Sequence, residues 1–358
     1  MDLGSLASFG TASTPGFRPG FKVSAGGGAG GGGGLLDAAV SLLSAPAADP
    51  WADNVTAIEI VEAPAPAVGV CRITLGRGAT APAVAVGDAL AIELGYDGTL
   101  AAAFTGSVAT IADGARGRLA IALSSPAQSL AELRQNASYE QQSFGDLVKQ
   151  WCGEAGVTPG SVDDGPSYPF LAVDDRRSAW EWIALLARTA GVYAWVGADG
   201  KLNATTPATT PARSFHHGED VLRLAFSERR PLLGELTVTG EGAAGSQGSD
   251  AWSWLLTDPA SVQSTAGSGA PKRLYQYGAL RSLDAADAAA SGIQARAQSL
   301  AAEARVTVPG SADLGVGSCF ELADCPGGRG DGSYVVVAAR HRYEKARGFT
   351  SMLTGVLA

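Results

Sequence analysis

The sequence predicts a mainly β chain of the α+β class, with two β-rich regions on either side of a small α+β unit. Three observations support this prediction. Gly, Ala, Ser and Thr are abundant while Met and His are scarce, and small residues with short valine-rich runs favour strands and tight turns over a helical bundle. Strand-like segments recur at regular spacing in both halves of the chain. Helical periodicity is confined to the middle and to one alanine-rich stretch.

The first 50 residues are predicted to be a flexible N-terminal arm. Residues 1–25 are polar and rich in turn formers, and residues 26–34 are almost all glycine. A glycine run of this kind is typical of a tether, and it lacks the Lys-Ser/Thr pair of a phosphate-binding loop. Residues 35–44 (LLDAAVSLLS) are compatible with a short helix or a packing strip at the end of the arm.

Residues 51–127 are predicted to form the first β domain. Its strand-like segments are each bounded by Gly, Asp or Pro, which is the pattern of an antiparallel barrel or sandwich. The predicted strands are 55–61, 70–76, 88–95, 100–111 and 117–125.

Residues 128–212 are predicted to be a small α+β domain. Two helices begin at a serine followed three residues later by an acidic residue, and each closes at a glycine. After the second helix, segments 192–196 and 201–206 are joined through Asp199-Gly200 and predict a β-hairpin. The helix-starting pairs are Ser143 with Asp146 and Ser178 with Glu181, and the closing residues are Gly156 and Gly191.

Residues 213–358 are predicted to form the second β domain. One long alanine-rich helix, over residues 284–304, is inserted among its strands. The predicted strands are 221–226, 234–240, 251–256, 303–310, 318–324, 333–343 and 349–357.

Composition excludes several classes of function. The net charge is −9 and no basic stripe is visible, so we expect no specific binding of nucleic acid. No run of apolar residues is long enough for a transmembrane helix, so we expect no stable membrane insertion. The N-terminus lacks the order of charged and apolar residues typical of a secretory signal peptide, which predicts that the chain is made in the cytoplasm.

The residues that usually carry chemistry are scattered, so we predict no catalytic residue, no cofactor and no metal site. His216 and His217 are adjacent and would point to opposite faces of a strand, while His341 follows an apolar run and is expected to be structural. No Gly-x-Ser-x-Gly motif occurs. Neighbouring carboxylates such as Asp174-Asp175 diverge, whereas glycoside hydrolysis needs two that face each other.

Two short motifs have simple structural interpretations. Cys319 and Cys325 are spaced so that either a disulfide or two reduced thiols would fit, although the scattered cysteines form no disulfide framework. Arg329-Gly330-Asp331 matches an integrin-binding tripeptide, but in a glycine-rich context it is more typical of a hairpin tip.

Stretches from about residue 52 to the end together resemble a known family. GDALAIELGYDGTLAAAFTGSVATI (87–111) has its first-barrel pattern, residues 133–157 and 178–202 have its two middle helices and hairpin, and residues 309–322 and 332–356 have its closing hairpins. Their order resembles the baseplate hub family of contractile tails, which includes phage late-control D hub proteins and the hub part of type VI secretion spike proteins.

The resemblance implies a non-enzymatic structural hub in the baseplate of a virion tail or of an injection particle. It implies two tube-like antiparallel β-barrels per chain and a homotrimeric ring that adapts the six-fold tail tube above to a three-fold spike below. The tube protein, a separate trimeric spike protein and other baseplate proteins are the expected partners. With a net charge of −9 per chain, the ring suggests an acidic inner wall that repels DNA, unless the charge lies on the outside.

Aromatic residues of the second β domain are candidates for contacts between subunits or with the spike. Aromatic side chains are enriched at such contacts, and two tryptophans share one face of a predicted strand. The candidates are Trp252, Trp254, Tyr334, His341, Tyr343 and Phe349. Two alternatives remain open from the sequence, a tail-associated cell-wall hydrolase and a host-binding adhesin.

Overall fold

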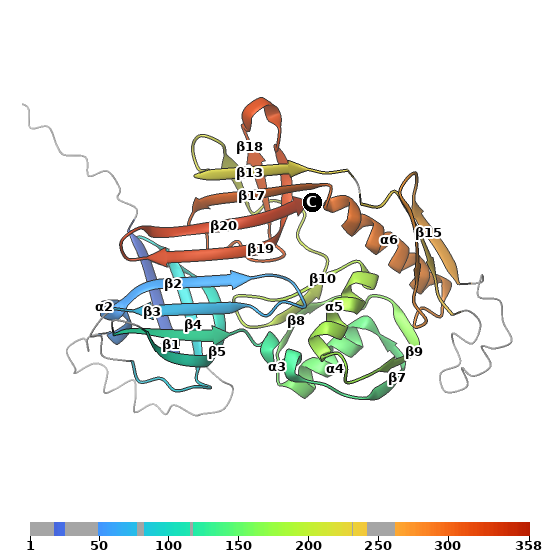
Figure 1. Cartoon of the computed structure of the whole chain (residues 1–358), viewed down its shortest axis with the longest axis horizontal. Coiled ribbons are helices and arrows are strands. Elements are labelled where there is room, and N and C mark those ends of the chain that lie inside the picture. The colour runs from blue at the N-terminus through green and yellow to red at the C-terminus, as the bar shows by residue number, and fades with distance from the viewer. Residues whose placement is uncertain (1–17, 26–48, 77–81, 115–116, 231, 242–261) are drawn as a thin grey trace, which may run out of the picture.

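The computed structural model is mainly β, as predicted, and its largest element is a mixed sheet of twelve strands (Figure 1). The path through this sheet is β1-β4-β5-β6-β3-β2-β19-β20-β17-β13, with β18 and β12 branching from β19. The residues that the structure describes are 18–25, 49–76, 82–114, 117–230, 232–241 and 262–358. The predicted glycine tether, the segment 35–44 and the predicted strand 251–256 lie outside them.

The first half of the sheet comes from the first predicted β domain and from one strand that the sequence analysis missed. That strand, β1, lies in the segment assigned to the arm, and it pairs antiparallel with β4 along its whole length. Its Val23 is buried against the sheet core. A short helix, α2 (Pro50–Asn54), precedes β2. The strands are β1 (Pro19–Ala25), β2 (Val55–Glu62), β3 (Val70–Leu75), β4 (Ala89–Tyr96), β5 (Thr99–Gly114) and β6 (Arg118–Ser124).

The second half of the sheet comes from the closing part of the chain. The hairpin of β19 and β20 lies at its centre, and β17 pairs with the other edge of β20. A short 3-10 turn, η3 (Pro326–Gly328), lies in the tip that contains the Arg-Gly-Asp sequence. The strands are β12 (Arg213–His216), β13 (Arg223–Glu228), β17 (Ala302–Pro309), β18 (Cys319–Ala323), β19 (Gly332–Glu344) and β20 (Gly348–Leu357).

The two halves are one sheet, where the sequence suggested two separate barrels. Strand β19 joins them, because its segment 339–344 pairs with β2 and its segment 332–335 pairs with β18. The register between β19 and β20 shifts between Val336 and Ala338. An irregularity of this kind bends a strand, so the two ends of β19 pair with different neighbouring strands. The pairing among the described strands follows an open path and closes no barrel.

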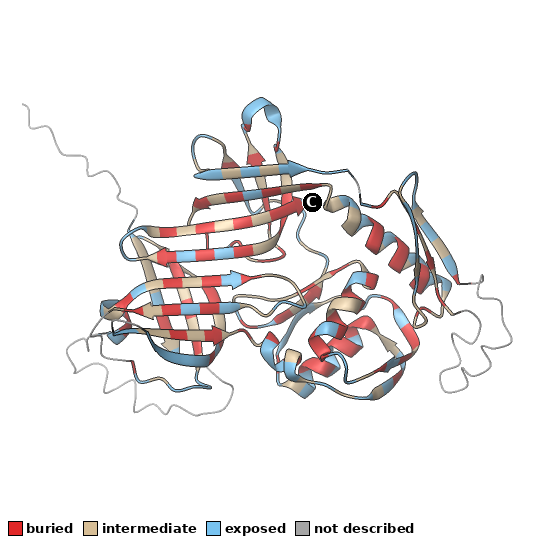
Figure 2. Cartoon of the chain, viewed as in Figure 1, coloured by how far each residue is buried: buried red, intermediate tan, exposed pale blue. Residues whose placement is uncertain are grey.

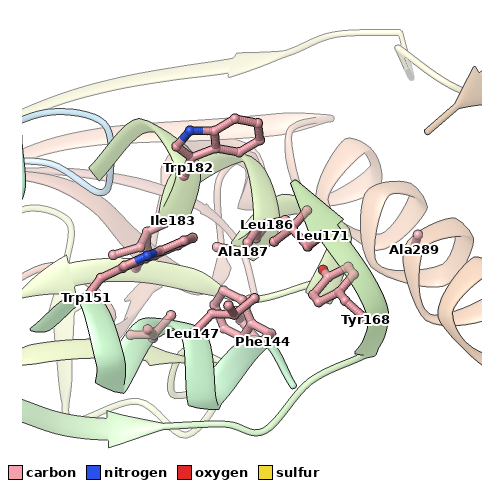
Figure 3. Packing of buried hydrophobic residues seen from close by; sticks show 14 of the residues in the cluster. Phe144, Leu147, Trp151, Tyr168, Leu171, Trp182, Ile183, Leu186, Ala187 and Ala289 are labelled. Atoms are coloured by element: carbon pink, nitrogen blue, oxygen red, sulfur yellow. The ribbon is translucent and has the colours of Figure 1, made fainter. Parts of the chain in front are cut away.

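The middle unit has the two predicted helices with the predicted caps. Both serines accept a hydrogen bond from the third residue of their helix while the acidic side chain bonds back to the serine, and both closing glycines are left-handed. Apolar side chains of the two helices face each other, with Tyr168 and Leu171 beside them (Figure 3). The elements are α3 (Ala127–Glu132), β7 (Ala137–Ser143), α4 (Phe144–Ala155), β8 (Pro159–Val162), β9 (Ser167–Val173), α5 (Ala179–Ala190), β10 (Tyr193–Val196) and β11 (Leu202–Thr205).

The inserted helix, α6 (Leu283–Ser299), packs against the middle unit. It covers a small sheet of β14 (Glu235–Thr239), β15 (Gln263–Gly267) and β16 (Lys272–Gln276) (Figure 1). The sequence analysis extended this helix to residue 304, but the chain leaves it after Ser299 because residues 302–309 are needed as β17. Strands β15 and β16 are short and polar, which explains why their sequences gave no strand signal.

Candidate functional site

One face of the large sheet lies open from β5 to β13, and we call it the open face. Buried residues alternate with half-buried or exposed ones along much of its strands, as Figure 2 shows for β19 and β20. One cross-strand row of exposed or half-buried residues runs Thr110, Ala122, Arg72, Glu59, Arg342 and Thr350. A second row runs Val61, Arg340, Met352, Thr307 and Arg223.

Side chains on the open face are mostly small or charged, with a few aliphatic ones such as Val61 and Met352. Alanine, serine and threonine dominate, and the described residues of this face include no aromatic side chain. Glu59 accepts a hydrogen bond from Arg340 at 2.6 Å, and Glu303 pairs with Arg305 at 3.3 Å and with Arg229 at 3.0 Å. The charged residues of the face are Arg72, Arg118, Arg223, Arg305, Arg340, Arg342, Glu59, Glu303 and Glu344. Arginines outnumber glutamates, so this face is not acidic.

The candidate contact residues of the second β domain lie on the other, covered face. Tyr334, His341, Tyr343 and Phe349 expose 1%, 1%, 6% and 2% of their surface. They pack inside the chain and have almost no surface to offer a partner. This placement follows from strand alternation, because these residues share the inward side of β19 and β20. Trp252 and Trp254 lie outside the described residues.

These inward residues instead join parts of the fold to each other. The Tyr334 hydroxyl donates to the Gly330 carbonyl at 2.9 Å, and the Tyr343 ring lies 5.0 Å from that of Phe21 in β1. His341 shares a 2.8 Å hydrogen bond with the Ser351 hydroxyl. Burial lowers the pKa of His341 to about 4, so its ring is neutral at physiological pH, as a structural residue would be.

The other residues considered for chemistry are held in structural contacts. His216 hydrogen-bonds Asp324 at 2.7 Å, and this bond raises the pKa of His216. Asp174 pairs with Arg176 in the loop before α5. Cys319 and Cys325 are free and buried, so the disulfide that the sequence left open is not formed. In the Arg-Gly-Asp tip, Asp331 accepts a hydrogen bond from the Cys325 backbone N–H at 2.8 Å.

The described residues contain neither a candidate metal site nor a helix that could span a membrane. No group of three or more His, Cys, Asp or Glu side chains there could hold a metal ion. None of the helices in that part of the chain is long and apolar enough to cross a bilayer.

The large sheet and its open face indicate the general class to which this protein belongs. A broad sheet whose uncovered face carries mainly small and charged side chains, some of them in ion pairs, fits a protein that works through its surfaces. The sequence analysis did not single out these outward residues. The available signal was the alternation within parts of the strands, because Ala57 and Glu59 alternate with Ile58 and Ile60, and Ala338, Arg340 and Arg342 alternate with Ala339, His341 and Tyr343.

Comparison with known proteins then identifies the family. Residues 71–346 match the model of the phage tail baseplate hub (GPD) family, so the chain belongs to that family and is a structural hub protein of a phage tail. This confirms the resemblance found in the sequence. No significant match was found among curated proteins.

Several solved structures share the fold of this chain. The 43 kDa tail protein of prophage MuSo2 from Shewanella oneidensis has a TM-score of 0.63 at 15% identity, over 85% of this chain and 94% of that one. A tail protein from Neisseria meningitidis has a TM-score of 0.64 at 13% identity, over 85% and 92%. The E. coli c3393 protein, a component of the type VI secretion system, has a TM-score of 0.52 at 13% identity, over 85% and 74%.

Proposed function

We propose that this hub protein assembles as a homotrimeric ring that joins the six-fold tail tube to a three-fold spike, and that its role is structural and not enzymatic. The observation that carries the proposal is the single sheet joined through β2 and β19. Each chain offers two β regions side by side, so three chains offer six similar surfaces to a hexameric tube. Closed three-fold symmetry would also limit the assembly to a ring.

Two unpaired sheet edges support contacts between neighbouring chains. Among the described strands, β1 pairs only with β4, and β13 pairs only with β17. An open strand edge attracts other strands and is usually covered in a stable protein. We propose that neighbouring subunits, or the tube and spike proteins, cover these edges in the baseplate.

The open face is our candidate for the inner wall of the ring. Most of its side chains are small, and arginine–glutamate pairs such as Arg340 with Glu59 reduce the local positive potential. An unpaired arginine would attract phosphates. We propose that this pairing lets DNA or an acidic cargo pass without binding.

Solution mass and electron microscopy test the ring. We expect a complex of three times the 36.1 kDa chain mass, alone or with the tube and spike proteins, and a ring in negative-stain images. A protein that stays monomeric even beside both partners would contradict the proposal. A peptidoglycan-cleavage assay addresses the alternative of a cell-wall hydrolase, and cleavage by the purified chain would contradict the structural role.

A charge variant tests the inner wall. Glu59→Gln removes the acceptor of Arg340 and frees positive charge on the open face, so we expect slower release of DNA from assembled particles. Glu140→Gln, which alters an exposed glutamate of β7 away from this face, is the control and should release DNA at the normal rate. Equal rates for both variants would rule out the open face as the wall.

A further inference from the structure

Glu62 is a buried carboxyl group without a charge partner. It is the last residue of β2 and points to the covered side of the sheet, where only 8% of its surface is exposed. Within the described part of the chain, its carboxyl group makes no hydrogen bond and no ion pair. Burying an ionisable group in this way is costly unless something pairs with it.

The Glu62 carboxyl lines a cavity of about 350 Å³. The cavity lies where three parts of the fold meet: strands β2 and β5, the β10–β11 hairpin, and the loop 312–318 between β17 and β18. A side chain on Gly315 would begin 3.7 Å from the Glu62 Oε2 atom. The absence of a side chain there leaves the carboxyl group facing open space.

The charged neighbours of the cavity already have partners or lie elsewhere. Asp313 lines the same cavity, but its Oδ2 atom is 3.1 Å from the Arg213 guanidinium on β12. On the sheet side, His341 of β19 is neutral and bonded to Ser351, Cys71 of β3 is a buried thiol, and Glu59 lies on the opposite face. The lining includes no lysine or arginine. Any cation that pairs with Glu62 must therefore come from outside the cavity.

Trp195 gives the cavity an aromatic wall. The indole lines the cavity and is held against Gly317, where an added Cβ atom would lie 2.4 Å from the ring. An indole face and a carboxylate together are a favourable environment for an organic cation, through cation–π attraction and charge-assisted hydrogen bonds. A calcium ion would need about six to eight oxygen ligands, more than two carboxylates with one already paired can supply.

We propose that this cavity is a socket for a guanidinium group, the arginine side chain of a neighbouring polypeptide in the tail. The guanidinium would form two parallel hydrogen bonds with the Glu62 carboxylate and stack on Trp195. This inference adds to the proposed hub role by naming the chemistry of one contact. Burial raises the pKa of Glu62 to about 7, so an arriving guanidinium would displace the proton that the empty socket holds at neutral pH.

Calorimetric titration with N-acetyl-arginine methylamide tests the socket on the isolated full-length chain. At pH 8 we expect saturable binding of one probe per chain. At pH 5.5 the affinity should fall by about thirtyfold, because protonated Glu62 must first lose its proton. At pH 7, buffers of different ionisation enthalpy should report proton release on binding. Absence of saturable binding at pH 8 would overturn the proposal.

Variants separate the socket from general effects. Glu62→Gln should weaken probe binding by at least about tenfold, while Trp195→Leu should weaken it less and Glu140→Gln should leave it unchanged. Circular dichroism checks that each variant is folded. Wild-type affinity in folded Glu62→Gln would refute the socket.

The solution mass of Glu62→Gln separates this inference from the hub proposal. If the Glu62→Gln variant still forms the ring but no longer binds the probe, both the ring and the socket are supported. A wild-type protein that binds the probe but forms no ring overturns only the ring.

Discussion

Gly191 and Gly292 touch each other backbone to backbone. Gly191 ends α5 in the left-handed conformation, at φ 73°, and Gly292 lies within α6. A Cβ atom on Gly292 would lie 2.4 Å from the Gly191 Cα atom, and one on Gly191 would lie 2.8 Å from the Gly292 Cα atom. This contact lets the inserted helix dock on the middle unit.

Gly292→Ala should therefore destabilise the protein by about 1–3 kcal/mol, even though alanine favours helices, because the backbone of Gly191 must move. Urea unfolding measures the change. Gly153→Ala is the matched control, since Gly153 lies on α4 with open space around its Cβ position. That variant should be as stable as the wild type or up to about 1 kcal/mol more stable. A stabilised Gly292→Ala protein would show that the helices do not approach this closely.

The Tyr96 hydroxyl should contribute to the junction between the two halves of the sheet. It donates to the Phe349 carbonyl and accepts from the Gly310 N–H at 3.0 Å. Tyr96→Phe should cost about 1–3 kcal/mol in unfolding free energy, because both bonds are lost in a partly buried site. Tyr193→Phe is the control, since its hydroxyl makes no hydrogen bond with the described residues, and a change within about 0.5 kcal/mol is expected. Equal effects of the two variants would contradict this role.

Glu62 should make stability depend on pH. Its pKa is raised from 4.5 in the unfolded chain to about 7 in the fold, so the folded state holds the proton more tightly. The stability that protonated Glu62 adds to the folded state is therefore complete below pH 4.5 and is lost as the pH rises through 7. Glu62→Gln should gain up to about 3 kcal/mol at pH 8 and nothing near pH 4.5. Unfolding midpoints across this range measure it, and a gain independent of pH would contradict the assignment.

His341 should act in the opposite direction. Its pKa is lowered from 6.5 to about 4, so its contribution is present above pH 6.5 and is lost as the pH falls toward 4, by up to about 3 kcal/mol. In the wild type, the stability that Glu62 adds as the pH falls from 6.5 to 4.5 offsets the stability that His341 loses over the same range. In Glu62→Gln the loss should become visible. A flat profile for that variant over this range would argue against a buried neutral His341.

NMR of the three histidines checks the same assignment directly. The His341 ring signals should remain those of a neutral ring down to about pH 5. His216 should titrate above its ordinary range because of its hydrogen bond to Asp324, and Asp324→Asn should lower its pKa. A His341 signal that titrates near pH 6.5 would show that the ring is exposed.

Much of the local structure could be predicted from the sequence because its causes are local. The caps at Ser143 and Ser178 are each contained within four residues, and the alternation in β2 and β19 is visible along each strand. Strand β1 was missed because its pairing with β4 is distant in sequence. Glu62 gave no signal, since it reads as an ordinary polar residue at the end of a strand.

The contact residues show the limit of reasoning from residue type. Tyr334 and Phe349 are aromatic, and aromatic residues serve equally well in a core or an interface. Only the register of β19 and β20 placed them inside. The same register placed Arg340 and Arg342 outside, on the open face.

The sequence by itself determined the mainly β class, the two capped helices and the order of segments that marks the hub family, because these follow from the spacing of residues along the chain. Tertiary structure alone decided that the two β regions are one sheet and that α6 docks on the middle unit. It also decided which carboxyl group is left unpaired in a cavity. Those outcomes depend on pairing between residues far apart in the chain, such as Glu62 with Ala339, and no local pattern specifies such partners.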